Sequence, residues 1–393
     1  MSLVAEASHY FLNVYKRIPV NIIKGEGVWL IDEKGDRYLD LLAGIAVNAL
    51  GYSHPKIIAA IDKQKSRNLH LSNYFVQDIQ LDLARKLVEL TPFNKVFFAN
   101  SGTEAIEGCL KLVKKWGNTT NKNQIISFSG SFHGRSLGSV SITGQDKYNK
   151  NFKPLLPNIS IIPFNDVISF RNSISDDTCA VFFEGLSGEG GIREISAELL
   201  HAIKSGRDKH NFLVICDEIQ TGVGRTGKFY NFEYFDFEPD VIATAKGLGG
   251  GLPLAAFLVS EKLADVFDIG EHGTTYGGNP LACATGLATV ESVSESAFLA
   301  GVIEKGNYFK SKLEELAFKY QGLIKEVRGK GLMLGVEVHH SGPEIIDKAI
   351  DEKLIFNVAG GGSVLRFVPP LIIKKDHIDM SVEILDRIFK ELN

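Results

Sequence analysis

The chain contains few cysteines and carries no excess of positive charge. Only four cysteines occur among its 393 residues, and no two of them form a Cys-x-x-Cys pair. This argues against a disulfide framework and favours free, buried thiols in a reducing compartment. The formal net charge of −4 gives no basic surface for a polyanion, so we expect no nucleic-acid partner. The cysteines are Cys109, Cys179, Cys216 and Cys283.

Long apolar runs are also missing. No stretch reaches the roughly 18 apolar residues of a membrane-spanning helix, and residues 1–6 lack the basic start and apolar core of a signal peptide. We therefore expect a cytoplasmic protein with no membrane partner. No cluster of His, Cys, Asp and Glu has the spacing of zinc ligands, so no metal site is expected. The Gly-x-Ser-x-Gly elbow of serine hydrolases is absent as well.

What the chain does contain is a regular alternation of strands and helices. Its 44% hydrophobic and 23% charged residues are ordinary for a globular protein. Between about residues 78 and 285, short apolar segments alternate with helical patterns such as 79–90, 101–116 and 196–210. This order predicts an α/β fold with a mostly parallel sheet covered by helices on both faces. The predicted strands are 96–99, 124–128, 159–163, 179–183, 212–219, 241–245 and 255–259.

The two ends of the chain have a different pattern. Residues 28–31 and 38–40 read as two short strands around a turn, and the part after residue 286 mixes long helices with short strands. This α+β pattern predicts a smaller domain that packs on the first. We expect an N-terminal segment of the small domain at 1–50, a large domain at 51–285 and the rest of the small domain at 286–393.

Lys246 is the most informative residue of the chain. It ends the apolar segment 241–245 and is followed by the glycine-rich run 247–251. An amine at such a strand end can form a Schiff base with a flat aldehyde cofactor. The strand at 212–219 carries Asp217, and pyridoxal 5'-phosphate (PLP) needs such a carboxylate to keep its ring nitrogen protonated. A surface lysine after a strand is the plain alternative for Lys246 alone, and the pairing with Asp217 favours PLP.

The segment after the predicted strand 96–99 indicates an anion site. Ser101 and Glu104 fit a capping box at the start of a helix, and Gly102 lets a ligand approach the backbone. Free amides and the helix dipole suit a phosphate there, and Thr103 adds a hydroxyl. An ordinary capped helix explains the same residues without a ligand.

Two further loops follow predicted strands and carry aromatic or charged groups. One holds Phe132, whose ring can stack on a planar cofactor, and Arg135, which can hold a carboxylate. The other is glycine-rich, holds Glu184 and Glu189, and is expected to be mobile at the ligand-binding edge of the sheet. The plain alternatives are a core phenylalanine, a solvated arginine and a solvated loop.

Residues 222–227 match Gly-x-Gly-x-x-Gly, but we do not assign a dinucleotide site to them. The residues 228–233 show no helical face, and the pyrophosphate of a dinucleotide needs a helix N-terminus. We expect a flexible loop beside Asp217 instead. Further along, Thr274 and Thr275 lie in a glycine-rich turn and offer hydroxyl donors to a phosphate.

Together these loops resemble those of the class III (ornithine-type) aminotransferases. That resemblance implies a fold type I PLP enzyme, with a large domain on a mostly parallel sheet and a smaller α+β domain. It covers nearly the whole chain and is nearest to the branch of the family that acts on N-acetylornithine in arginine biosynthesis. The motifs that carry it are 44–51, 100–105, 132–135, 217–227, 246–251 and 274–283.

The resemblance implies a PLP site and its residues. Lys246 and Asp217 are the implied catalytic pair, and Gln220 is placed like the residue that contacts the 3-oxygen of the ring. Thr275 resembles a threonine that reaches the cofactor of the neighbouring subunit, which implies a homodimer with active sites at the interface. The implied cofactor-binding residues are Ser101, Gly102, Thr103, Phe132, Asp217, Glu218, Gln220, Lys246 and Thr275.

The resemblance also implies how two substrates are bound. Arg135 resembles the arginine that holds the α-carboxylate. Glu189 and Arg366 resemble a switch pair, in which the glutamate covers the arginine during one half-reaction and frees it in the other. Thr274 stands where the family commonly has a substrate-contacting serine, and Tyr15 stands where the N-terminal segment approaches the substrate.

The implied activity moves the ω-amino group of an N-acylated ornithine to 2-oxoglutarate, which yields a semialdehyde and glutamate. N-succinylornithine, ornithine and 4-aminobutyrate are alternative donors. A PLP decarboxylase, racemase or aminomutase and a non-catalytic binding protein are alternative uses of the same scaffold.

The chain departs from the family at one loop. The usual Glu-Pro-Ile-Gln-Gly-Glu-Gly is Glu-Gly-Leu-Ser-Gly-Glu-Gly at residues 184–190. Because Gly185 replaces the proline, we expect a looser loop. Ser187 is shorter than the usual glutamine, which predicts a roomier substrate pocket that suits N-succinylornithine.

Overall fold

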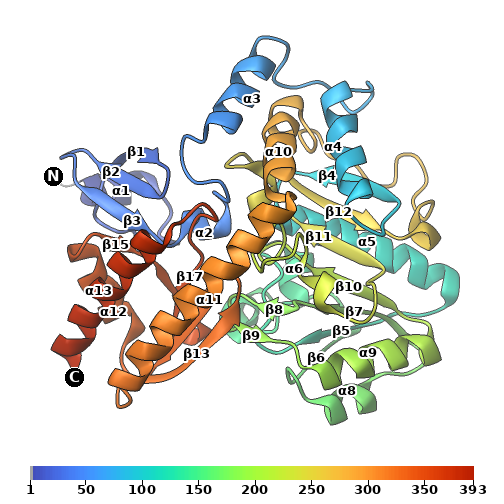
Figure 1. Cartoon of the computed structure of the whole chain (residues 1–393). Coiled ribbons are helices and arrows are strands. Elements are labelled where there is room, and N and C mark those ends of the chain that lie inside the picture. Colours follow the sequence, from blue (N-terminus) through green and yellow to red (C-terminus); the bar gives the residue numbers. More distant parts are fainter. Residues whose placement is uncertain (1–2) are drawn as a thin grey trace.

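A seven-stranded sheet forms the centre of the molecule in the computed structural model, which describes residues 3–393 (Figure 1). The strand order is β4-β12-β11-β10-β7-β5-β6, and only β12 runs antiparallel to its two neighbours. This confirms the predicted α/β fold with a mostly parallel sheet. The strands are β4 (Lys95–Ala99), β5 (Gln124–Phe128), β6 (Ile159–Ile162), β7 (Thr178–Phe183), β10 (Leu213–Asp217), β11 (Val241–Thr244) and β12 (Ala255–Val259).

Helices cover both faces of this sheet. Side chains alternate across a strand, so successive residues of β10 enter different hydrophobic clusters. Val214 and Cys216 pack in one cluster, and Leu213 and Ile215 pack in the other. Burial on both faces explains why these strands are continuously apolar in the sequence. The second cluster is covered by α5 (Gly102–Thr120), and the first includes residues of α4 (Asp78–Glu89) and α9 (Ala197–His210).

The two ends of the chain lie side by side, as the blue and red segments of Figure 1 show. β15 (Leu354–Ile355) pairs in parallel with β3 (Arg37–Asp40) and joins the sheet of β1 (Ile22–Glu26) and β2 (Trp29–Asp32). This pairing joins the strands between residues 22 and 40 to the C-terminal part, and the assignment of residues 1–50 to the smaller domain stays a proposal. The expected boundary at residue 285 falls inside one continuous helix, α10 (Pro280–Val293), which packs against α4. We therefore propose a division beyond Val293.

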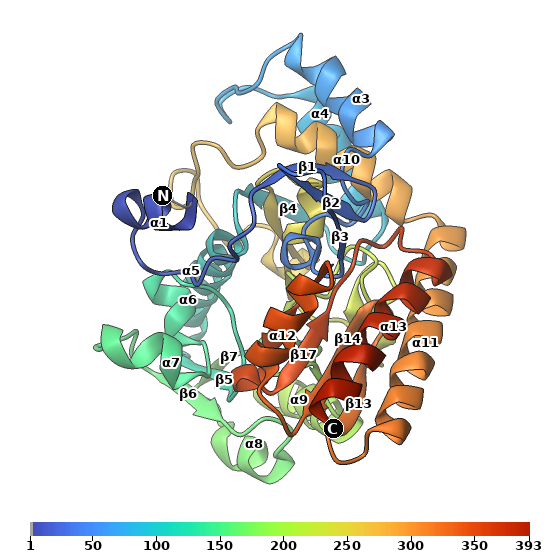
Figure 2. The same cartoon turned by 90° about the vertical axis from the view of Figure 1, so that its left-hand side faces the viewer.

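The C-terminal part forms a second, antiparallel sheet with helices on one side (Figure 2). The long helices and short strands expected after residue 286 are present. β16 and β15 were not predicted, because two or three residues show no periodicity. The elements are α11 (Ser296–Lys319), β13 (Ile324–Lys330), β14 (Met333–Val338), α12 (Gly342–Asp351), β16 (Asn357–Ala359), β17 (Val364–Phe367) and α13 (Lys375–Leu392).

Several other short elements surround the large sheet. Most were not expected from the sequence, again because they are too short to show a clear period. These elements are α1 (Leu3–Tyr10), α2 (Ala43–Ala46), α3 (Pro55–Lys65), α6 (Leu137–Ser141), α7 (Asp146–Asn149), α8 (Val167–Ser173), β8 (Leu186–Ser187) and β9 (Arg193–Glu194).

Two further observations concern the cysteines and the apolar helices. All four cysteines are free and buried, which confirms the expected thiols. In the part of the chain that the structure describes, no single helix is long and apolar enough to cross a membrane. α10 and α11 taken together have the length and composition, but the chain bends by 73° between them.

Candidate active site

The carboxyl ends of the parallel strands open into a cavity of about 460 Å³. Lys246 comes just after β11, Asp217 ends β10 and Glu184 follows β7, so three neighbouring strands bring charged groups to one edge. Open α/β sheets bind ligands at this edge. The sequence-predicted residues that line the cavity are Ser101, Gly102, Thr103, Phe132, Arg135, Glu189, Asp217, Gln220 and Lys246.

The N-terminus of α5 forms one wall of the cavity. Ser101 is the N-cap, and its Oγ accepts a hydrogen bond from the amide of Glu104. Within residues 3–393 the amides of Gly102 and Thr103 have no protein acceptor, as is usual in a first helical turn. The Thr103 hydroxyl lies 2.8 Å from the Ser139 hydroxyl. The backbone amides, rather than this hydroxyl, are therefore left for an anion.

The carboxylate of Asp217 is held from two sides. Its Oδ2 lies 2.7 Å from Nδ1 of His133, and its Oδ1 accepts from the amide of Ile219 at 3.0 Å. Burial lowers the pKa of His133, but the hydrogen bond and charge of Asp217 outweigh burial and raise that pKa above its usual value. The contacts with His133 and Ile219 therefore fix the orientation of the Asp217 carboxylate.

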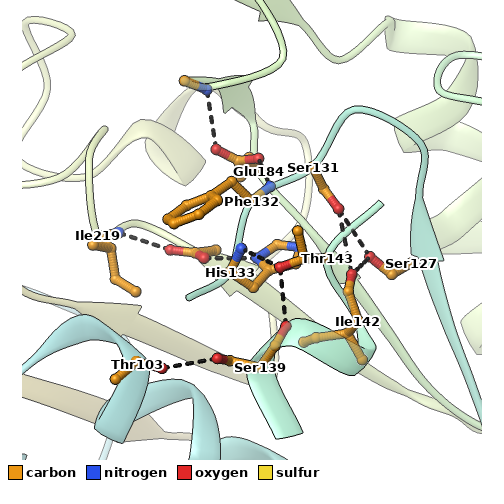
Figure 3. Close-up of polar contacts among 12 residues, drawn as sticks. Thr103, Ser127, Ser131, Phe132, His133, Ser139, Ile142, Thr143, Glu184 and Ile219 are labelled. Carbon is orange, nitrogen blue, oxygen red and sulfur yellow. Dashed lines mark hydrogen bonds and ion pairs between the residues drawn. The ribbon is translucent and has the colours of Figure 1, made fainter. Parts of the chain in front are cut away.

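Sequence reasoning missed His133. It is 84 residues from Asp217 in sequence, and only the order of the strands brings the two together. The His133 amide donates to Thr143 Oγ1 at 3.0 Å, and Thr143 in turn donates to the carbonyl of Ser139, as Figure 3 shows. This chain of bonds connects the support of Asp217 to the wall at α5.

Glu184 connects two loops at the cavity (Figure 3). Its Oε2 accepts from the amide of Phe132 at 3.1 Å, and its Oε1 accepts from the amide of Gly188 at 3.0 Å. Burial raises the pKa of Glu184 to about 7, against the opposing charge of His133. The loop that begins here was expected to be mobile, but residues 184–188 are all buried. These contacts explain why this part of the loop is held in place.

Lys246 lies in the left-handed region of the backbone map, with φ of 47°. This conformation is uncommon for a residue with a side chain and indicates a constrained site. Burial, and after it the positive charge of Arg366, lowers the pKa of Lys246 to about 8. A larger neutral fraction near neutral pH suits a nucleophilic or basic amine.

Arg366 and Glu189 form an ion pair beside the cavity. The Arg366 side chain is 1% exposed, and its Nη1 donates to Glu189 Oε1 at 2.6 Å. Burial raises the pKa of Glu189, but the charge of Arg366 outweighs burial and holds that pKa below its usual range. Arg366 lies on β17 of the C-terminal part, whereas Glu189 belongs to the loop after β7. The structure thus brings together the residues predicted to act as a switch pair.

Glu218 is turned away from the cavity. Its carboxylate accepts from the amides of Asn231 and Phe232 at 3.0 and 2.7 Å. Asp217 ends its strand facing the cavity, and neighbouring residues on a strand face opposite sides. The position of Glu218 therefore does not support a contact with the cofactor.

Three other predicted residues also lie outside this cavity. Tyr15 is 71% exposed on the N-terminal segment. Thr274 and Thr275 line a second, surface hollow of about 840 Å³. Thr274 Oγ1 accepts from Asn100 Nδ2 at 3.2 Å, and Asn100 lines the first cavity. Within the described residues of the single chain, the cavity of Lys246 is not lined by Tyr15, Thr274 or Thr275.

The departure from the family loop lies beside the cavity. Ser187 is buried and does not line it, so the expectation of a roomier substrate pocket at this residue is not supported. The glycine at position 185 is explained by the lack of space for a side chain. A Cβ at this position would lie 2.2 Å from Asn231 Nδ2 and 2.7 Å from Phe235 Cζ. A proline does not fit unless these neighbours move, and the loop is packed rather than loose.

The loop at residues 222–227 is buried as well, which corrects the expectation of a flexible loop. No α-helix follows it directly, and only a short 3-10 helix at Asn231–Tyr234 comes before β11, in agreement with the rejected dinucleotide site. Arg225 is fully buried, and its Nη1 donates to the carbonyls of Leu332 and Pro369 at 3.0 and 2.5 Å. Burial lowers the pKa of Arg225 to about 9. This loop therefore ties the large sheet to the C-terminal part.

Sequence reasoning also missed the apolar wall that contains Val47. It follows residues 43–46, which all have positive φ, between 51° and 66°. Asp40 holds this left-handed turn by accepting from the amides of Leu42 and Ala43 at 2.7 and 3.0 Å. Only one of the four residues is glycine, so the sequence gives no signal for the turn. Other lining residues without a predicted role include Asn100, His133, Gly134, Leu252, Pro253 and Leu254.

The groups at this cavity fit PLP, the cofactor that the resemblance implies. The unpaired amides of Gly102 and Thr103 suit a phosphate at the helix N-terminus. The ring of Phe132 lines the cavity and suits a planar partner. The charged carboxylate of Asp217 suits a protonated ring nitrogen, and the amine of Lys246 suits an aldehyde.

Comparison with known proteins supports the same family. Residues 10–389 match the family model described as aminotransferase class-III. The acetylornithine aminotransferase of Caldanaerobacter subterraneus subsp. tengcongensis is 43% identical over 394 residues, which cover 99% of this chain and all of that protein.

Solved structures are similar over the full length too. The ornithine aminotransferase from Toxoplasma gondii has a TM-score of 0.94 at 28% identity, covering 99% of this chain and 94% of that one. The N-acetylornithine aminotransferase from Stenotrophomonas maltophilia has a TM-score of 0.85 at 31% identity, covering 98% of each chain. With its fold, its cavity and a family match over nearly its whole length, this chain belongs to the class III aminotransferases.

Proposed function

We propose that this aminotransferase moves the ω-amino group of N-acetylornithine to 2-oxoglutarate, giving a semialdehyde and glutamate, in arginine biosynthesis. Relatives named acetylornithine aminotransferase, 43% and 45% identical over nearly the whole chain, support this substrate. The observation that carries the proposal is the pair Glu189–Arg366 near Arg135. The site thus offers two arginines that can bind carboxylates. Among the described residues Arg135 has no ion-pair partner, and Arg366 is paired with Glu189.

PLP is the cofactor, and when bound it supplies an electron sink for the carbon that loses a proton. The amides of Gly102 and Thr103 would hold its phosphate, Phe132 its ring face and Asp217 its ring nitrogen. Lys246 takes up and returns a proton at Nζ, because a pKa lowered to about 8 places this amine near a working pH.

Arg135 and Arg366 divide the work of carboxylate binding. The Arg135 guanidinium has no ion-pair partner among residues 3–393, so it is free to hold the α-carboxylate of either substrate. Glu189 covers Arg366 while the ω-amine donor is bound. Glutamate and 2-oxoglutarate carry a second carboxylate, which replaces Glu189 on Arg366.

Stopped-flow rates of the two half-reactions test this division. Arg135→Ala should impair both halves, by roughly 1.5–3 kcal/mol, the loss typical of a hydrogen bond to a charged group, since Arg135 itself is exposed in the single chain. Glu189→Ala leaves Arg366 uncovered, so glutamate should react at least as well as before and the ω-amine donor should react more slowly. Equal losses in both halves for Glu189→Ala would rule out the switch.

The identity of the donor is tested with a panel. N-acetylornithine, N-succinylornithine, ornithine and 4-aminobutyrate are compared by kcat/KM with 2-oxoglutarate as acceptor. We expect N-acetylornithine to be the best donor. A higher value for any of the other three would replace it as the proposed substrate, while the aminotransferase assignment would stand.

We also propose a homodimer with its active sites at the subunit interface. Large apolar side chains are exposed at the hollow that contains Thr275, among them Tyr74, which is 96% exposed, and Ile269. Exposed apolar patches of this kind are typical of protein interfaces. Sedimentation equilibrium should give twice the chain mass, and Thr275→Ala should weaken PLP binding. A monomer that binds PLP as tightly as the dimer would contradict the proposal.

Finally, we propose a cytoplasmic location. Four free, buried cysteines suit a reducing compartment. Cell fractionation with antibodies against the protein tests this, and recovery in the membrane or extracellular fraction would contradict it.

A further inference from the structure

Arg135 is held at the cavity by aromatic rings instead of a counter-ion. Its guanidinium carbon lies 5.4 Å from the ring centroid of Phe132 and 4.1 Å from that of Tyr148. In the described part of the chain, no carboxylate pairs with it. A counter-ion would compete with a substrate carboxylate for the same donors, whereas an aromatic face attracts the cation and leaves its N–H edge free.

Tyr148 makes the closer of these two contacts. It lies on α7, is partly buried and does not line the cavity. Its ring also meets the Phe132 ring edge-on, with centroids 5.2 Å apart and an interplanar angle of 71°. Lys147 Nζ lies 4.6 Å from the same ring centroid. One tyrosine therefore contacts both the residue proposed to stack on the cofactor and the residue proposed to bind the carboxylate.

We propose that Tyr148 is a positioning residue for the substrate carboxylate, because its ring holds the Arg135 guanidinium at the cavity in a preorganised position. The inference rests on the proposed function, in which Arg135 binds that carboxylate. An unrestrained arginine side chain loses rotamer freedom when it binds, so a ring that restrains it beforehand improves carboxylate affinity. The rate of the chemical step does not depend on this contact.

A second role for the ring is to pack Phe132 and so support the cofactor. The two roles differ in what they change. Support of the cofactor would alter PLP affinity and kcat, and it would persist without Arg135. Positioning of Arg135 alters KM and carboxylate affinity, and it disappears once Arg135 is removed.

A double-mutant cycle in the PLP-loaded enzyme separates these roles. The variants are Tyr148→Leu, Tyr148→Phe, Arg135→Ala and the double variant Tyr148→Leu/Arg135→Ala. Tyr308→Leu is the matched control, since its partly buried ring lies under Lys312 and Lys375 and does not line the cavity. Steady-state kinetics gives KM and kcat, and calorimetry gives the Kd of glutarate, a dicarboxylate with no group to react.

We expect Tyr148→Leu to raise the KM of both substrates and the Kd of glutarate by about 2- to 5-fold, the size of a partly exposed cation–π contact. kcat should stay within about two-fold of the parent value. Tyr148→Phe should keep the parent KM, because the ring remains. In the Arg135→Ala background, Tyr148→Leu should add nothing, and Tyr308→Leu should leave KM and the glutarate Kd unchanged.

If Tyr148→Leu still lowers glutarate affinity in the Arg135→Ala background, the inference is overturned. The role of the Tyr148 ring is then to pack against Phe132. Unchanged glutarate affinity in Tyr148→Leu, together with a clear loss in Arg135→Ala, overturns the inference alone. Unchanged affinity in Arg135→Ala overturns the carboxylate role of Arg135 and, with it, the role of Tyr148.

Discussion

The amine of Lys246 shows how single residues at this site are tuned by their neighbours. Burial and the charge of Arg366 lower the pKa of this lysine, while the carboxylates of Asp217, Glu189 and Glu184 oppose the change. Burial and the charge of Arg366 outweigh the carboxylates, and the resulting pKa is about 8. A lysine on the surface would keep almost all of its amine protonated at neutral pH.

This lowered pKa makes stability depend on pH. In the unfolded chain Lys246 holds its proton up to about pH 10.5, but in the folded, cofactor-free protein it loses the proton near pH 8. Between these values the unfolded state binds more protons, so the stability of the fold rises with pH across this window. Below pH 8 the buried charge costs up to about 3 kcal/mol.

Lys246→Met removes this cost. At pH 7 the cofactor-free variant should be more stable than the parent protein by up to about 3 kcal/mol, and the difference should shrink towards pH 10.5. Urea unfolding at pH 7, 9 and 10.5 measures it. Lys34→Met on an exposed turn controls for loss of any lysine. A difference that stays constant over these pH values would contradict the expectation.

Asp217→Asn keeps the shape of the side chain and removes its charge. The proposed ionic contact with the PLP ring nitrogen would then be lost. Single-turnover proton transfer with glutamate should therefore slow by about 100-fold or more. PLP should still bind, because the groups proposed for phosphate, ring face and aldehyde are intact. Rapid-mixing absorbance measures the rate, and an equilibrium titration measures PLP binding. A variant with the parent rate would remove Asp217 from its proposed role.

At the scale of elements, the segment after β7 shows how packing replaces a rigid residue. The family's proline is absent here, yet the loop is buried, because Asn231 and Phe235 fill the space beside Gly185. Glu184 adds its two hydrogen bonds to backbone amides. The loop that carries Glu189 is therefore positioned by its neighbours.

Gly185→Ala should destabilise the protein by about 1–3 kcal/mol, the usual cost of overpacking. The new Cβ would meet the Asn231 amide nitrogen at 2.2 Å, so Asn231→Ala in the same chain should recover part of the loss. Denaturant midpoints of the two single variants and the double variant measure this coupling. If the two losses simply add, the steric explanation for Gly185 is wrong.

At the scale of the whole molecule, the active site depends on how the C-terminal part docks on the large sheet. Arg225 extends from the large sheet to the carbonyls of Leu332 and Pro369. Pro369 follows Arg366 closely in sequence, and Arg366 reaches Glu189 across the two parts. Docking therefore determines whether the proposed switch pair can form.

Arg225→Met should lower the free energy of unfolding by on the order of 1–3 kcal/mol, because two buried carbonyls lose their donor. We also expect a higher KM for 2-oxoglutarate, since Arg366 would be less well placed. Arg225→Lys keeps one donor and should fall between the parent and Arg225→Met. Calorimetric unfolding and steady-state kinetics test both parts. Parent-like stability and KM in Arg225→Met would exclude the docking role.

The sequence by itself determined the sheet, the main helices and the set of loops that surround the cavity. Continuous apolar strands, capping residues and glycine runs are local signals, so β11 and Lys246 or α5 and Ser101 could be read directly. Alternation along the predicted strand 212–219 could also have excluded Glu218, since neighbouring residues of a strand face opposite sides.

Only the tertiary structure decided which side chains meet. The contacts of His133 with Asp217, of Glu189 with Arg366 and of Tyr148 with Arg135 depend on strand order and domain docking. Ser187 is buried outside the cavity because of the way its loop packs. Local patterns indicate what each segment forms, but distant contacts arise from the closure of the whole chain, which no short stretch of sequence encodes.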